Sequence, residues 1–555
     1  MNYYKFLIVL FLSLFFSCSD NQIIKWENYD ENIEIIENST HEISRMRYKR
    51  IQSLSSDKND IFKPFYSFLK SYDKSHHENL KKLILDNDIY TIQGYISEDK
   101  FSYEDLVKFF IYRIYVHESD KSLYLNAIIS LNPNVIKEAR ELDKSIEKDN
   151  LLYGIPILIK DNINVKGLAT TAGASVFKNN YVDNNAFVIN KLKENNVLIL
   201  GKLNMSEWAY YFCRPCPVGY SSLGGQTLNP YGRKKFESGG SSSGSGVSIA
   251  ANYAMGSLGS ETSGSILSPS SKNSLVGLKA TIGNISRSGI IPISSFYDTS
   301  GPMTTNVMDN VLLYNGMIGY DKNDDLSYEV KKIDLKEMID FKGSNIKVGI
   351  SERYESDSLF IKALKDLKEI GVESVLFKSK SYSLPYFRNI LTSDMKRDLP
   401  KYILAHGNKN LSVKNVKDIV RYNNRDTFLH APYDQILFKE IMNDSISNIR
   451  LSEMKEETKS RADNYLNIIM KENNFDVFVS VDNDMAGIAA AAHYPALTIP
   501  MGYRDNGQPT NITFITRSNN EQLLYNLGFH YEKASMNRKM PDIYKKIPWL
   551  LFTTK

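Results

Sequence analysis

Two serine- and glycine-rich turns enclose a short stretch of small, mostly apolar residues, and no other feature of this 555-residue chain constrains its fold as strongly. The first turn spans residues 239–246, the apolar stretch 247–255 and the second turn 259–265. Most serine and glycine runs are flexible linkers, but a linker is not followed at once by residues that suit a buried helix. The two turns are therefore expected to bracket a core helix, with hydroxyl and backbone N–H groups converging on one spot.

The rest of the chain indicates an α/β protein. Short apolar runs with β-branched residues are typical of buried strands. Such runs occupy residues 151–163, 195–204, 345–350 and 474–481. Between two of them, the stretch 183–196 has its apolar residues mostly on one helical face. This alternation predicts an α/β sheet covered on both faces. The stretch from about 320 to 470 is richer in charge and tyrosine and is expected to be a substrate-shaping insertion or a surface region.

Composition argues against several classes of function. The 68 basic and 64 acidic residues give a net charge of +4, which is too even for a nucleic-acid binder with clustered positive charge. Three cysteines cannot build a disulfide scaffold. The eight histidines form no HExxH motif, and no cysteine–histidine cluster has zinc spacing. The sequence therefore predicts a large globular enzyme with no metal, no cofactor and no nucleic-acid partner.

The first residues have the pattern of a targeting signal. Lys5 precedes a mostly apolar run over residues 6–16, which is shorter than the about 20 residues that span a bilayer and fits a signal peptide. The sequence LFFSC at residues 14–18 is similar to a bacterial lipobox, in which cleavage leaves Cys18 as the lipidated first residue. Ordinary secretion with cleavage nearby and an uncleaved anchor are the alternatives. We expect a signal peptide over residues 1–17 and a lipid-anchored protein of the bacterial cell envelope, periplasmic or on the outer surface.

A serine nucleophile needs a base, and the sequence offers a lysine. There is no GxSxG elbow and no obvious histidine–aspartate pair for a serine–histidine–aspartate triad. Lys160 follows the apolar run 154–159, so burial should disfavour its charged form and lower its pKa. Neutral lysine accepts a proton near pH 7. The alternative is that Lys160 is simply paired with Asp161 at the end of a strand.

Several sequence blocks carry a family resemblance. They are GIPILIKDNINVKG (154–167), TTAGAS (170–175), GKLNMSEWA (201–209), GGQTLNPY (224–231), GLKATIGNISRSGIIP (277–292), TSGPMTTNVMDNVLL (299–313) and YPALTIPMG (494–502). Together with the two serine-rich turns, they resemble the amidase signature family over roughly residues 92–541, most closely its peptide-amidase branch. The resemblance implies a single large α/β/α sandwich with a mixed central sheet, occupying residues 91–555. Residues 18–90 are then a tether and an N-terminal helical extension.

The resemblance also implies a serine–cis-serine–lysine triad. Lys160 is the lysine, Ser241 the serine that follows a cis peptide bond, and Ser265 the nucleophile, 24 residues beyond Ser241. In the implied relay, Lys160 accepts a proton from Ser241 while Ser241 accepts one from Ser265, which attacks the amide carbonyl. The implied oxyanion hole consists of the backbone N–H groups of Thr262, Ser263, Gly264 and Ser265.

Four positions depart from the family pattern. Glu261 stands where aspartate is usual, Ser263 and Ser243 where glycine is usual, and Leu267 where arginine is usual. Glu261 keeps the charge, and Ser263 keeps its N–H group if its backbone conformation is tolerated. Leu267 is the largest departure because it deletes a cation next to the nucleophile.

Two other groups of residues are assigned to structure. Cys213 and Cys216 have CxxC spacing but no second cysteine pair, so a local disulfide or two loop thiols is favoured over redox or metal chemistry. His76 and His77 lie in a polar region and are expected to be solvated, while His493 is expected to be structural.

These observations lead to one main functional hypothesis and two alternatives. The main hypothesis is a serine hydrolase that cleaves the C–N bond of a linear carboxamide, and not a peptide bond, with a C-terminal peptide amide as a candidate substrate. An amidotransferase A-subunit-like protein is the first alternative, against which the exported N-terminus argues. A non-catalytic, surface-binding lipoprotein with an amidase fold is the second. The acyl group, the leaving amine and the oligomeric state stay unassigned.

Overall fold

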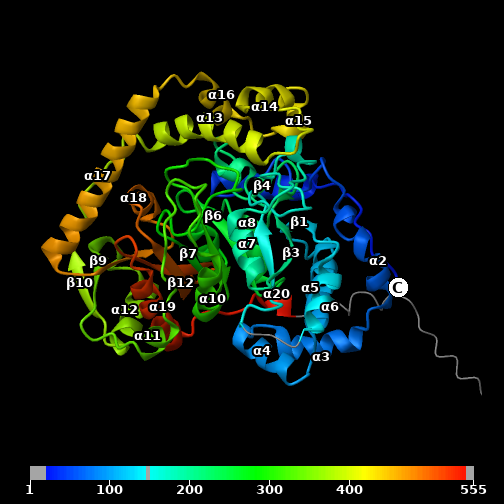
Figure 1. Ribbon diagram of the computed structural model, residues 1–555, viewed down its shortest axis with the longest axis horizontal. Helices are drawn as coiled ribbons and strands as arrows, with labels where there is room; N and C mark the ends of the chain where they lie inside the picture. Colours follow the sequence, from blue (N-terminus) through cyan, green and yellow to red (C-terminus); the bar gives the residue numbers. More distant parts are fainter. Residues whose placement is uncertain (1–20, 146–149, 546–555) are drawn as a thin grey trace, which may run out of the picture.

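A computed structural model of the protein describes residues 21–145 and 150–545 (Figure 1). The predicted signal peptide and Cys18 lie outside the described residues. The centre of the molecule is a mixed sheet of eleven strands in the order β1-β3-β2-β6-β8-β7-β12-β13-β11-β9-β10. The strands of this sheet are β1 (Ile128–Leu131), β2 (Pro156–Lys160), β3 (Leu198–Leu203), β6 (Gly256–Glu261), β7 (Val276–Lys279), β8 (Thr299–Thr304), β9 (Lys347–Ser351), β10 (Glu373–Phe377), β11 (Val477–Val481), β12 (Ala496–Tyr503) and β13 (Pro509–Ile515).

The sheet contains a parallel group of three strands towards each side, antiparallel pairs between these groups, and an edge strand, β1, that is antiparallel to β3. Strand β2 runs parallel to both β3 and β6, and β9 runs parallel to both β10 and β11. The pairs from β6 through β8, β7, β12 and β13 to β11 are antiparallel. All residues of β2 and β3 are buried, which explains why both read as continuous apolar runs. The predicted fold class, a single α/β/α sandwich with a mixed central sheet, is confirmed.

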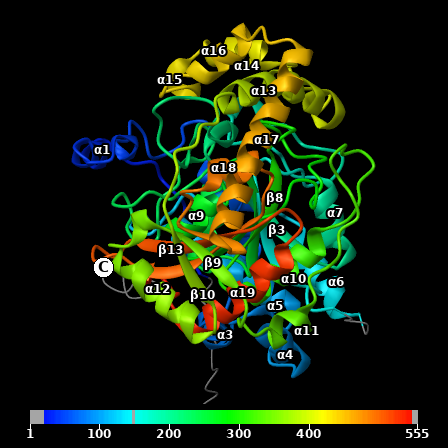
Figure 2. The same cartoon turned by 90° about the vertical axis from the view of Figure 1, so that its left-hand side faces the viewer.

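Helices cover both faces of the sheet (Figures 1 and 2). One layer contains α7 (Phe187–Glu194), α10 (Val307–Met317), α11 (Leu335–Asp340), α12 (Ser358–Glu369) and α19 (Glu521–Ser535). The other contains α8 (Ser243–Ala250), α9 (Leu267–Lys272) and α18 (Ala486–Ala491). The predicted helix between the serine-rich turns is α8, although it begins inside the first turn and ends at Ala250. The left-handed backbone of Asn252 stops it there (φ 56°). Among the described residues, no helix is both long and apolar enough to cross a membrane.

The stretch from 320 to 470 divides into two parts, so its prediction as a single insertion or surface region is only partly right. Strands β9 and β10 and helix α12 belong to the sandwich itself. Helices within residues 387–473 form a cap, most of which is drawn at the top of Figures 1 and 2. The cap helices are α13 (Phe387–His406), α14 (Val416–Asn423), α15 (Thr427–His430), α16 (Ile436–Asn443) and α17 (Asn448–Asn473).

Residues 21–90, expected to be a tether and an N-terminal helical extension, contain helices and are packed onto the fold along much of their length. Trp26, Met46 and Ile51 are buried in the same apolar cluster as the central strands. The N–H of Gln226, in the hairpin formed by β4 (Tyr220–Ser221) and β5 (Gly225–Gln226), donates to the Ile51 carbonyl at 2.8 Å. Helices α1 (Asn32–Asn38), α2 (Tyr66–Ser71) and α3 (Lys74–Ile84) lie in this region, and α4 (Ile89–Ser97) begins at its end. The expectation that His77 is solvated is wrong, because it is buried and stacked on Phe109.

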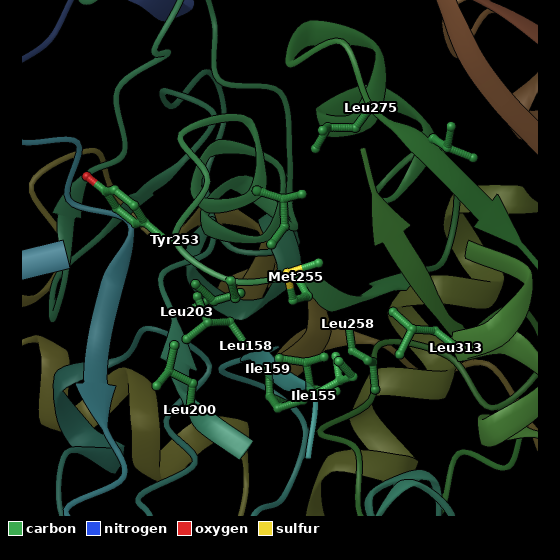
Figure 3. Close-up of a cluster of buried hydrophobic side chains, with 14 of the residues drawn as sticks. Ile155, Leu158, Ile159, Leu200, Leu203, Tyr253, Met255, Leu258, Leu275 and Leu313 are labelled. Carbon is green, nitrogen blue, oxygen red and sulfur yellow. The ribbon is translucent and has the colours of Figure 1, made fainter. Parts of the chain in front are cut away.

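The apolar core beneath the two serine-rich turns holds three strands together. Figure 3 shows Leu158 and Ile159 of β2, Leu200 and Leu203 of β3, and Leu258 of β6 within one cluster of buried side chains. Because these strands are neighbours in the sheet, their ends are fixed relative to one another. Lys160 is the last residue of β2 and Glu261 the last of β6, so this core places both at the same edge.

Candidate active site

Lys160 is fully buried and contacts serine oxygens. Its Nζ donates to Ser241 Oγ at 2.8 Å, and to the hydroxyl and carbonyl oxygens of Ser260, each at 2.9 Å. The alternative pairing of Lys160 with Asp161 is wrong, because Asp161 forms its ion pair with Lys202 at 3.2 Å. The lysine amine is therefore aimed at the two serine-rich turns.

Burial sets the protonation of this lysine. Removal from water lowers the pKa of Lys160 to about 7, and the negative charges of Asp298 and Glu261 oppose the shift. At that pKa, about half of the Lys160 side chains are neutral at pH 7. A neutral amine can accept a proton from the serine hydroxyl it contacts, as the sequence predicted.

The first turn presents Ser241 to the lysine. The peptide bond between Gly240 and Ser241 is cis, as the family resemblance implied. The Ser241 carbonyl accepts a hydrogen bond from the Ser206 N–H at 3.0 Å. A Cβ atom on Gly240 would lie 2.5 Å from Val218 Cγ1, so only glycine fits there. Ser243, a departure from the family, begins α8, and its hydroxyl donates to the Gly239 carbonyl at 2.7 Å.

Glu261 organises the second turn. Its carboxylate accepts the N–H groups of Gly264 at 2.7 Å, Ile266 at 2.7 Å and Leu267 at 3.0 Å. Gly264 adopts a left-handed conformation, with φ of 82°, that glycine tolerates best. Three charge-assisted hydrogen bonds hold the turn that carries Ser265 in one shape.

One of the four N–H groups expected in the oxyanion hole, that of Gly264, is already hydrogen-bonded within the protein. The Gly264 N–H already donates to Glu261, so it is not free for a substrate oxygen. In the part of the chain that the structure describes, the N–H groups of Thr262, Ser263 and Ser265 donate to no protein acceptor. These three remain as candidate oxyanion donors.

Ser265 lies at the end of the second turn, which is next to the first turn that carries Ser241. Its carbonyl accepts the Ser242 N–H at 3.2 Å, which joins the two turns directly. The Ser265 side chain is partly accessible, with 8% of the residue exposed, and its hydroxyl forms no hydrogen bond with the described residues. The structure thus forms the Lys160–Ser241 hydrogen bond of the expected relay but not one between Ser241 and Ser265. Catalytic hydrogen bonds often close only in the complex with substrate.

Two further departures from the family pattern, Ser263 in the second turn and Leu267 just after it, are both accommodated. Ser263 does not adopt a left-handed backbone, so a side chain is tolerated where the family has glycine. Leu267 is fully buried in an apolar cluster with Ala486 and Ile488. Its position therefore serves packing and contributes no cation to the site.

Three polar residues of the site were not predicted from the sequence. Ser260 accepts a hydrogen bond from Lys160, and Asn162 donates to the same Ser260 hydroxyl at 2.9 Å. Asp298 accepts the Thr262 hydroxyl at 2.5 Å. Ser260 could have been noticed because it lies within the second turn. No sequence pattern near Asn162 or Asp298 indicates a place in the site. They lie there because β2 and β8 both pair with β6.

The remaining candidates have structural roles. Cys213 and Cys216 form a disulfide, which decides between the two alternatives left open by their spacing. His493 packs against Phe296 with a left-handed backbone. Within residues 21–145 and 150–545, no three histidine, cysteine, aspartate or glutamate side chains are grouped so that they could hold a metal ion.

An α/β/α fold that presents a buried lysine and two serines on facing turns defines the class of this protein as a hydrolase. Comparison with known proteins gives the family. The chain belongs to the amidase signature family, since the family model for amidases matches residues 105–481. It is therefore an amide-hydrolysing enzyme.

This chain is similar in fold or in sequence to several known proteins. The crystal structure of an amidase family protein from Bacillus anthracis is 33% identical with a TM-score of 0.84, covering 89% of this chain and 100% of that one. The peptide amidase of Stenotrophomonas maltophilia is 28% identical with a TM-score of 0.78, covering 82% and 98%. The A subunit of glutamyl-tRNA(Gln) amidotransferase from Pediococcus pentosaceus is 30% identical over 466 residues, 77% of this chain and 93% of that protein.

Proposed function

We propose that the protein hydrolyses the C–N bond of a linear carboxamide through an acyl-enzyme on Ser265. The observation that carries this proposal is the 2.8 Å hydrogen bond from a fully buried lysine to the hydroxyl of Ser241. Because burial lowers the pKa of Lys160 to about 7, this contact joins a proton acceptor to a hydroxyl on the turn beside Ser265.

The proposed reaction proceeds by proton relay. Ser265 Oγ forms a bond to the carbonyl carbon while its proton passes to Ser241 Oγ and the Ser241 proton passes to Lys160 Nζ. The N–H groups of Thr262, Ser263 and Ser265 donate to the oxyanion. When the C–N bond breaks, the leaving nitrogen takes a proton back through Ser241. Water then attacks the acyl-enzyme by the same relay, releasing the acid and restoring Ser265.

A C-terminal peptide amide is the substrate we propose. The support is the likeness in fold and sequence to the peptide amidase of Stenotrophomonas maltophilia. The proposal is tested by measuring ammonia release from a panel of peptide amides and simple primary carboxamides, and aniline release from anilides, with the Ser265→Ala variant as control. We expect release from the peptide amides that the variant abolishes. Turnover of anilides alone would overturn the assignment of the leaving group, and full activity of Ser265→Ala would overturn the acyl-enzyme.

The similarity to the A subunit of the amidotransferase gives a second candidate, in which glutamine is the amide that loses ammonia. Glutamine added to the same panel separates the two. Ammonia release from free glutamine at a rate equal to that from peptide amides would favour the second candidate. We expect glutamine to be a poor substrate.

We also propose that the mature protein is anchored in the cell envelope through lipid on Cys18. The lipobox-like sequence supports this, and the Cys213–Cys216 disulfide is typical of an oxidising compartment. Asn21 is hydrogen-bonded to α2 through the Lys70 carbonyl. Mass spectrometry of the mature N-terminus tests the proposal, and an unmodified residue there would contradict it.

A further inference from the structure

We propose that Asp298 is a positioning residue for amide hydrolysis: it holds residues 262–265 (the oxyanion turn) in place and ties them to the helical cap. The inference rests on the proposed acyl-enzyme mechanism, in which the N–H of Thr262 is one of three free donors on that turn. Asp298 was not among the residues that the sequence indicated. It lies just before β8, the strand that pairs with β6 and so with the base of the turn.

The carboxylate of Asp298 is fixed by three donors. Its Oδ1 accepts the Thr262 hydroxyl at 2.5 Å. Its Oδ2 accepts the N–H of Ile293 at 2.8 Å and the N–H of Ser294 at 2.9 Å. Since two of these donors are backbone groups, the carboxylate has one orientation and Thr262 is held against it. The turn around Ser265 is therefore held by two carboxylates. Glu261, within the turn, accepts backbone N–H groups, and Asp298, outside it, accepts the Thr262 hydroxyl.

The same loop connects the turn to the cap. The hydroxyl of Ser294 donates to Asp394 of α13 at 2.5 Å. Asp394 in turn pairs with Lys455 of α17 at 2.6 Å. Both Ser294 and Asp394 are almost completely buried. A continuous chain of polar contacts therefore runs from two cap helices through Asp298 to the first residue of the oxyanion turn.

Asp298 also acts on the lysine through its charge. Among the charged groups that oppose the loss of the Lys160 proton, Asp298 has the largest effect and Glu261 the next. Burial raises the pKa of Asp298 itself to about 6, so it is mostly ionised at neutral pH. Asp298 borders a cavity of about 300 Å³ between its loop and α13. The other charged or titratable residues that line this cavity are Arg287, Asp324, Asp325, Asp398, Lys401, Tyr402 and His406.

The mechanical and the electrostatic effects can be compared by substitution. Thr262→Val removes the hydrogen bond to Asp298 and keeps its carboxyl group, whereas Asp298→Asn removes the carboxyl group itself. Since the Thr262 hydroxyl lowers the pKa of Asp298, its loss also weakens the negative charge at that residue near neutral pH. We expect Thr262→Val to lower kcat about 10- to 100-fold, because an oxyanion donor is displaced, and to move the acid limb in the same direction as Asp298→Asn but by less.

Asp298→Asn is expected to lower kcat and to move the acid limb of kcat/KM to lower pH by about half a unit or more. The sign follows because the anion stabilises protonated Lys160, so that its removal leaves the lysine neutral at lower pH. Asp398→Asn is the matched control, since Asp398 borders the same cavity and contacts the backbone of Ser295. It should change neither quantity.

A merely structural Asp298 would change the melting temperature and the fraction of active enzyme without moving the acid limb. Rates are therefore expressed per active site titrated with a fluorophosphonate. The positioning role would be overturned if Asp298→Asn kept both the wild-type acid limb and the wild-type kcat per titrated site. This conclusion requires that Ser265→Ala is inactive, so that the proposed function itself stands. Full activity of Ser265→Ala would instead overturn the proposed function on which the role rests.

Discussion

At the scale of single residues, the site depends on a lysine kept out of water. Lys160 is fully buried at the end of β2, and its amine contacts only oxygens of Ser241 and Ser260 among the described residues. Such an environment weakens the charged form and makes the amine a base near neutral pH. The same burial also lowers the free energy of unfolding when Lys160 is protonated, because the charged amine has no carboxylate at hydrogen-bond distance within the described residues.

The first prediction concerns the pH dependence of activity. Neutral Lys160 is the active form and its pKa is about 7, so kcat/KM should rise with pH through a single ionisation with its midpoint near pH 7. Initial rates with a peptide amide between pH 5 and 9 measure this. A midpoint below pH 5, or a rate that falls between pH 6 and 8, would contradict the assignment of Lys160 as base.

The second prediction separates activity from stability. Lys160→Met should lower kcat by about 10²- to 10⁴-fold, the usual contribution of a general base. The pKa of Lys160 is lower in the folded than in the unfolded state, so wild-type stability should increase as pH rises from 7 towards 10. The variant lacks this increase and should melt no lower than wild type at pH 7. Calorimetry at pH 7 and 9 provides the measurement, and identical pH dependence in both proteins would contradict it.

The third prediction concerns Glu261, the departure from the usual aspartate. Glu261→Gln replaces one carboxylate oxygen with an NH₂ group that faces N–H donors, so kcat should fall about 10-fold or more. Glu261→Asp keeps the charge and serves as the matched variant, with a smaller loss expected. If both variants retain wild-type kcat, the carboxylate does not shape the turn.

At the scale of elements, the sequence predicted two of the strands at the site, β2 and β3, and the helix between the two turns, but not β6 or β8. Residues 151–163 and 195–204 contain β2 and β3, whose burial on both faces produces a continuous apolar run. Asn162 and Asp298 could not be predicted, because their contacts with the site depend on strand pairing. The strand β10 was also missed, since as an exposed edge strand it lacks the apolar run of a buried one.

The fourth prediction belongs to the loop that carries the disulfide. The bridge between Cys213 and Cys216 closes a short loop, so its entropic contribution is about 2 kcal/mol. The Phe212 carbonyl beside it accepts the N–H of Leu437 in α16, which links this loop to the cap. The double variant Cys213→Ser/Cys216→Ser should melt a few degrees lower than wild type. Reductant should lower the melting temperature of wild type alone, and equal sensitivity of both proteins would contradict the prediction.

At the scale of the whole molecule, residues 21–104 lie outside the stretch matched by the family model and yet complete the fold. The N–H of Lys49 donates to Tyr433, beyond α15 in the cap, at 2.7 Å, and the N–H of Gln226 donates to the Ile51 carbonyl. This segment therefore joins the cap to the hairpin that follows the disulfide loop. The cap is held to the sandwich on one side by the N-terminal segment and on the other by Asp394.

The fifth prediction follows from this packing. A chain that lacks residues 21–57 loses the buried side chains of Trp26, Met46 and Ile51. We expect it to be insoluble or to melt at least about 10 °C lower than wild type, since each large buried side chain contributes about 2–5 kcal/mol. A chain that lacks only residues 1–20 is the control. Equal melting temperatures and activities of the two would show that the segment is dispensable.

The central claim is that Ser265 becomes covalently acylated, and a fluorophosphonate probe tests it without knowledge of the substrate. Peptide mapping by mass spectrometry locates the labelled residue. The account predicts a single adduct on Ser265, no adduct in Ser265→Ala, and much slower labelling in Lys160→Met. Labelling of another serine, or none in correctly folded wild-type protein, would contradict it.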